Sequence, residues 1–94
     1  MTREEIVERT NRIFEESFEI EPARLVPGAR IFEELGLDSL DIVDLIVALQ
    51  KQFHVQIRED ERIRAIRTLA DVYAFIERIG QEEERKRVAS PGGK

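Results

Sequence analysis

Three segments of the chain repeat apolar residues at intervals of three and four, the spacing that buries one face of an α-helix. They span residues 2–18, 38–53 and 68–79. No stretch of useful length alternates apolar and polar residues as a half-buried β-strand does. With 94 residues, the chain can form one domain around one modest core. The pattern predicts an all-α fold, a small three-to-four-helix bundle with a long loop between the first and second helices.

Capping signals stand at the start of the first and last of these segments. Thr2 followed by Glu5 has the form of a capping box, and Thr68 followed by Asp71 repeats it with a shorter acid. Residues 59–65 predict one or two further helical turns. The side chains expected to face the core are Ile6, Thr10, Ile13, Phe14 and Phe18 in the first helix and Leu69, Val72, Ile76 and Ile79 in the last, flanked by Tyr73 and Phe75.

The connection between residues 19 and 37 loses the helical period and contains Pro22, Pro27 and Gly28. A turn is expected within residues 31–36, ended by Gly36. At the other end, residues 81–94 have almost no apolar content, although their charges have the spacing to extend the last helix. We therefore expect one domain over residues 1–80, followed by a charged extension at 81–94 that is partly disordered, from about Ser90.

The net charge of −5 is concentrated in one part of the chain. Between Ile31 and Gln50 there are acids and no base, whereas acids and bases balance elsewhere. The negative net charge argues against a nucleic-acid-binding surface. The acidic segment either steers basic partners towards the protein or is an ordinary solvated helix face. Neither a signal peptide nor an apolar run long enough to span a membrane is present, so we expect a soluble, cytoplasmic protein. We also expect the chain to be a monomer. The acids of this segment are Glu33, Glu34, Asp38, Asp41 and Asp44.

The helix expected at residues 38–53 has two apolar stripes, which is unusual for a helix in a small bundle. One stripe consists of Ile42, Leu45, Ile46, Leu49 and Phe53 and must face the core. The second consists of Leu40, Val43 and Val47 and is bordered by Asp41 and Asp44. It either packs against another helix or remains exposed as a docking strip for partner proteins.

Residues for catalysis are nearly absent. There is no cysteine, and the only histidine, His54, would lie roughly 22 Å from Ser39 along a continuous helix at about 1.5 Å per residue. We therefore expect no enzyme, no catalytic residue and no metal site. Ser39 stands at a helix start, where a serine most simply caps the helix. A phosphodiester formed on its hydroxyl would also be stabilised there by the helix dipole and free backbone N–H groups.

The run from Phe32 to Asp41, which contains the triplet Asp38, Ser39 and Leu40, resembles the modification site of the acyl carrier proteins of dissociated fatty-acid and polyketide synthesis. The resemblance continues through Val43, Asp44, Leu45, Ala48, Leu49 and Phe53, and more weakly through about 80 of the 94 residues. It implies that Ser39 receives 4′-phosphopantetheine from coenzyme A and that acyl groups are held as thioesters on this arm. The arm would then supply the thiol that the sequence lacks.

The same resemblance implies partners and their contact residues. Asp38 would help a phosphopantetheinyl transferase to arrange its metal and substrate. Acyl-loading and synthase enzymes with basic docking surfaces would contact Leu40, Asp41, Val43, Asp44 and Val47. Alternatives are an aminoacyl or peptidyl carrier protein, with a similar fold and arm, and a non-covalent helical adaptor that uses the apolar strip alone.

Two departures from the family pattern suggest a specialised carrier. The second helix ends on Gln50, Lys51 and Gln52 where family members often have acids. The stretch between the second helix and the last, where members are also often acidic, contains several arginines, Arg58, Arg62, Arg64 and Arg67. We also expect a small apolar space beside the second helix that shelters the acyl chain. Its expected lining is Phe32, Ile46, Leu49, Ile66 and Tyr73.

Overall fold

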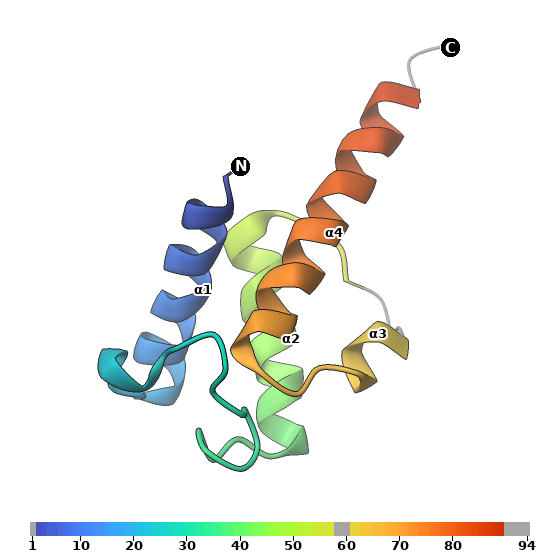
Figure 1. Cartoon of the computed structure of the whole chain (residues 1–94). Coiled ribbons are helices and arrows are strands. Elements are labelled where there is room, and N and C mark those ends of the chain that lie inside the picture. Colours follow the sequence, from blue (N-terminus) through green and yellow to red (C-terminus); the bar gives the residue numbers. More distant parts are fainter. Residues whose placement is uncertain (1, 58–60, 90–94) are drawn as a thin grey trace.

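The computed structural model describes residues 2–57 and 61–89, and within these ranges the chain is a helical bundle (Figure 1). Its helices are α1 (Arg3–Phe18), α2 (Ser39–Phe53), α3 (Glu61–Arg64) and α4 (Leu69–Ala89), with a short 3-10 turn at Pro22–Arg24. Helix α1 packs against both α2 and α4. The described part of the chain forms no strand, only an isolated antiparallel bridge between Arg30 and Thr68. The all-α bundle predicted from the sequence is confirmed.

Both capping boxes expected from the sequence are present. At α1, the Glu5 backbone N–H donates to the Thr2 hydroxyl at 3.2 Å, and the Thr2 N–H donates to the Glu5 carboxylate at 2.9 Å. At α4, the Asp71 backbone N–H donates to the Thr68 hydroxyl at 3.3 Å, and the Thr68 N–H donates to the Asp71 carboxylate at 3.0 Å. The Asp71 carboxylate also accepts from the Arg67 N–H at 2.8 Å, and this bond is the main reason that the pKa of Asp71 is lowered. The polar pattern at these two positions therefore fixes where the helices begin.

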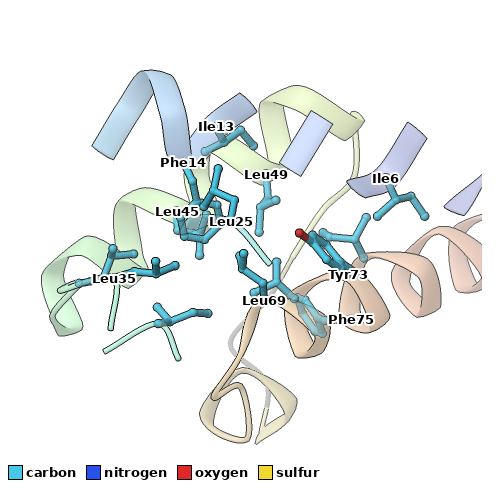
Figure 2. Packing of buried hydrophobic residues seen from close by; sticks show 14 of the residues in the cluster. Ile6, Ile13, Phe14, Leu25, Leu35, Leu45, Leu49, Leu69, Tyr73 and Phe75 are labelled. Atoms are coloured by element: carbon cyan, nitrogen blue, oxygen red, sulfur yellow. The ribbon is translucent and has the colours of Figure 1, made fainter. Parts of the chain in front are cut away.

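The core lies between α1, α2 and α4, and Figure 2 shows side chains from these helices meeting there. Phe14 of α1, Leu49 of α2 and Val72 of α4 are essentially inaccessible to solvent. Tyr73 is also buried, and its hydroxyl donates a hydrogen bond to the side-chain oxygen of Asn11 on α1. Burial raises the pKa of this phenol above its ordinary value. Of the core residues expected in α1 and α4, Phe18 alone is only half-buried.

The connection from α1 to α2 is folded onto the core. Ile31 and Leu35 are buried, and Gly36 adopts a positive φ of 76° that ends the expected turn. The Leu37 N–H then donates to the Ile31 carbonyl at 3.1 Å. A glycine is favoured at this φ because a side chain would clash with the backbone. The turn delivers Asp38 to the start of α2.

Helix α4 continues past Gly80 to Ala89, beyond the other helices in Figure 1. The boundary expected at residue 80 therefore falls inside a continuous helix. The disorder expected from Ser90 lies outside the described residues. None of the helices within the described ranges is long and apolar enough to cross a bilayer.

Candidate functional site

Asp38, and not Ser39, caps α2. The Asp41 N–H donates to the Asp38 carboxylate at 2.9 Å, and the Asp38 N–H donates to the Asp41 carboxylate at 3.0 Å. Ser39 is the first residue of the helix proper and is exposed. Its hydroxyl has no hydrogen bond to any residue that the structure describes. The simple capping role considered for Ser39 is therefore wrong, and its hydroxyl is accessible for chemistry.

The second apolar stripe of α2 faces solvent. Leu40 is 77% exposed, Val43 58% and Val47 44%, so none of them packs as a core residue. Asp44 beside them is exposed, whereas Asp41 is half-buried and engaged in the cap. We call these five residues the α2 front. An apolar strip of this kind, bordered by carboxylates, is typical of a surface that binds other proteins.

A cavity of about 200 Å³ opens beside Ser39, between α2, α3 and α4. Ser39 itself, Ile46 and Leu49 line it from α2, and Phe32, Ile66 and Phe75 complete much of its apolar wall. Four of the five expected lining residues are thus correct. Tyr73 is not among them, because its side chain lies on the other side of α4 and bonds to α1. Phe75 lines the cavity instead; Ile42, Leu45, Ile63 and Arg64 are the remaining lining residues.

Arg64 is the charged residue of this lining, and the sequence did not predict its place there. Its only signal in the sequence was the unusual number of arginines at residues 58–67. The helical pattern could not indicate that α3 would present Arg64 to the same cavity as Ser39, because that depends on how α3 packs.

The arrangement offers an attachment point and a binding surface. His54 is exposed at the C-cap of α2, at the opposite end of the helix from Ser39. No group of three potential metal ligands comes together among the side chains that the structure describes. A phosphopantetheine group fits this site, because an exposed hydroxyl at the first position of a helix lies beside an apolar cavity. A phosphate bound there would lie at the positive end of the helix dipole.

Comparisons with known proteins agree with this geometry. A family model described as a phosphopantetheine attachment site matches residues 10–76. Acyl carrier protein 2 of Ralstonia nicotianae is 44% identical over 79 residues, covering 84% of this chain and 96% of the relative. An acyl carrier protein of Thermosynechococcus vestitus is 40% identical over 76 residues, covering 81% of this chain and 93% of the relative.

A solved structure has the same fold. The crystal structure of an acyl carrier protein from Thermotoga maritima superposes with a TM-score of 0.71 at 28% identity, covering 85% of this chain and 92% of that one. The family-model match includes the whole of the helix that begins at Ser39. The chain therefore belongs to the acyl carrier protein family, whose members are phosphopantetheine-dependent carriers and not catalysts.

Proposed function

We propose that the Ser39 hydroxyl holds the 4′-phosphopantetheine arm on which this chain carries acyl groups. The arm, when attached, supplies the thiol that forms a thioester with the acyl group. The observation that carries the proposal is the exposed Ser39 hydroxyl, which Asp38 relieves of the capping role. Asp38 lies next to the attachment oxygen, where it helps the phosphopantetheinyl transferase to position its metal and substrate.

The protein's own residues have three tasks in this function. Ser39 forms the phosphodiester, and the first turn of α2 holds that serine at the surface. The cavity receives the first part of the acyl chain, since an apolar cavity of about 150 Å³ is already large enough to bind benzene.

The carrier domain occupies residues 1–80, and residues 81–94 form a charged extension that continues from it.

The α2 front is the proposed docking surface for the transferase and for acyl-loading and synthase enzymes. Its exposed leucine and valines supply apolar contact area, and Asp44 supplies charge that attracts basic surfaces. Family membership implies a transferase and synthase-type enzymes as partners. The particular enzymes, the monomeric state and the cytoplasmic location stay predictions.

Intact mass spectrometry after incubation with a phosphopantetheinyl transferase and coenzyme A tests the attachment site. The wild-type chain should gain the mass of one phosphopantetheine. Ser39→Ala should gain no mass. Its free energy of unfolding should lie within about 1 kcal/mol of the wild-type value, because Asp38 still caps the helix. Ser17→Ala, at an exposed serine of α1, is the matched control and should be modified normally. A mass gain by Ser39→Ala, or no mass gain by the wild-type chain, would refute the assignment of Ser39.

A further inference from the structure

Arg64 lies at the cavity beside Ser39. It is the last residue of α3, is exposed, and lines the same cavity of about 200 Å³ as Ser39. Its guanidinium makes no hydrogen bond or ion pair with another residue that the structure describes, although its backbone carbonyl accepts from Arg67. Since no partner for this cation is found among the residues that the structure describes, it is available to an anion that enters or crosses the cavity mouth.

The surroundings of Ser39 are otherwise acidic. Asp38 and Asp41 close the cap of α2, and Asp44 is exposed one turn further on. A phosphodiester on Ser39 would add a further negative charge to this end of the bundle. The helix dipole offsets part of the repulsion, but its first turn already accommodates two carboxylates. A cation within reach of the new phosphate would therefore stabilise the modified state.

An arginine is suited to this task because its planar guanidinium can donate two parallel hydrogen bonds to phosphate oxygens. We propose that Arg64 binds the phosphodiester of the arm on Ser39 and so directs the arm across the mouth of the cavity. This inference rests on the proposed function of Ser39. Arg64 is then a positioning residue: it biases the arm towards the apolar walls formed by Ile63 and Ile66, and away from the α2 front.

The direction of the arm has a consequence for partner enzymes. With the phosphate held by Arg64, the arm and its acyl group lie on the cavity side of α2, while the α2 front stays open for docking. An enzyme that docks there must release the arm from Arg64 in order to reach the thioester. Because the contact is exposed to solvent, it is weak enough for such a release.

The test compares wild-type chain, Arg64→Gln, Arg64→Lys and Arg78→Gln, each fully loaded with the arm as verified by intact mass. Arg78→Gln removes an exposed arginine of α4 that does not line this cavity. The first readout is the ³¹P resonance of the phosphodiester. The second is the relaxation enhancement of the Ile63 and Ile66 amides caused by a spin label on the arm thiol. Neither readout depends on enzymatic activity.

We expect the ³¹P resonance to shift in Arg64→Gln and to stay unchanged in Arg78→Gln, with Arg64→Lys in between. At about 1 M salt, where the screening length is about 3 Å, the wild-type resonance should move to the position of Arg64→Gln. The population of the arm near Ile63 and Ile66 should fall about two- to fivefold in Arg64→Gln, as for an exposed ion pair.

The outcomes separate this inference from the proposed function. A wild-type chain that gains no mass from the transferase would refute the assignment of Ser39 and this inference with it. Full loading of all four proteins with identical ³¹P resonances and identical relaxation would refute the role of Arg64 alone. Equal shifts in Arg64→Gln and Arg78→Gln would likewise overturn it, since they would indicate a general loss of positive charge.

Discussion

Neighbouring residues at the start of α2 have different roles. Asp38 satisfies the N–H of Asp41 and leaves the Ser39 hydroxyl without a structural duty. The sequence alone could not assign these roles, because aspartate and serine are both good N-caps and stand side by side. The reciprocal bond from the Asp38 N–H to Asp41 decides the matter in favour of Asp38. Because Asp38 is the cap, the proposed modification of Ser39 would leave the cap of the helix intact.

The side chain of Thr10 on α1 lowers the stability of the fold. It is fully buried, and its hydroxyl oxygen has no hydrogen-bond partner within the described part of the chain. A buried unsatisfied polar group costs about 1–3 kcal/mol, so Thr10→Val, which keeps the shape and removes the hydroxyl, should raise the free energy of unfolding by about 1 kcal/mol. Urea unfolding followed by circular dichroism measures this change. Thr10→Ser, which loses a methyl group and keeps the hydroxyl, should destabilise by about 0.8 kcal/mol. Destabilisation by Thr10→Val would contradict the account.

The front of α2 should attract partners through charge. Asp44→Lys changes the net charge from −5 to −3 without removing a buried or capping group, whereas a change at Asp41 would also break the cap. It should slow association with the transferase and leave the dissociation rate nearly unchanged, and added salt should slow the wild type in the same way. Stopped-flow or surface-plasmon measurements give both rates. Glu16→Lys, which makes an equal charge change at an exposed position of α1, is the control. Equal association rates for all three proteins would remove the steering argument.

The helices themselves follow closely from the sequence. The capping residues Thr2 and Thr68 and the apolar period predicted where α1 and α4 begin. The core stripe of α2 predicted that Leu45, Leu49 and Phe53 are buried. The second stripe left open whether it packs against another helix or stays exposed, and in the structure it is exposed. The sequence did not predict which neighbour each side of α4 meets. Tyr73 and Phe75 are about 200° apart around that helix, so one faces α1 and the other the cavity. Helical periodicity describes one helix at a time and does not specify the packing of its partners.

At the scale of the whole bundle, the cavity predicts that an attached acyl group raises the stability of the fold. An acyl chain that enters it removes apolar surface from water, at about 0.8 kcal/mol per CH₂, and does so only in the folded state. A medium-length acyl group should therefore raise the melting temperature relative to the unacylated arm, as measured by calorimetry. Ile46→Phe, which fills part of the cavity, should reduce this increase. If the acylated and unacylated wild-type proteins melt at the same temperature, and no chemical shift changes at Ile46 or Leu49 on acylation, the acyl chain stays in solvent.

The central claim is that the acyl group is held as a thioester on an arm attached to Ser39. Tandem mass spectrometry of the peptide containing Ser39, after loading with an acyl group and with or without neutral hydroxylamine, tests it most directly. We predict that the arm and acyl masses both map to Ser39, and that hydroxylamine removes the acyl mass and leaves the arm in place. An acyl mass on another residue, or one that resists hydroxylamine, would contradict the account.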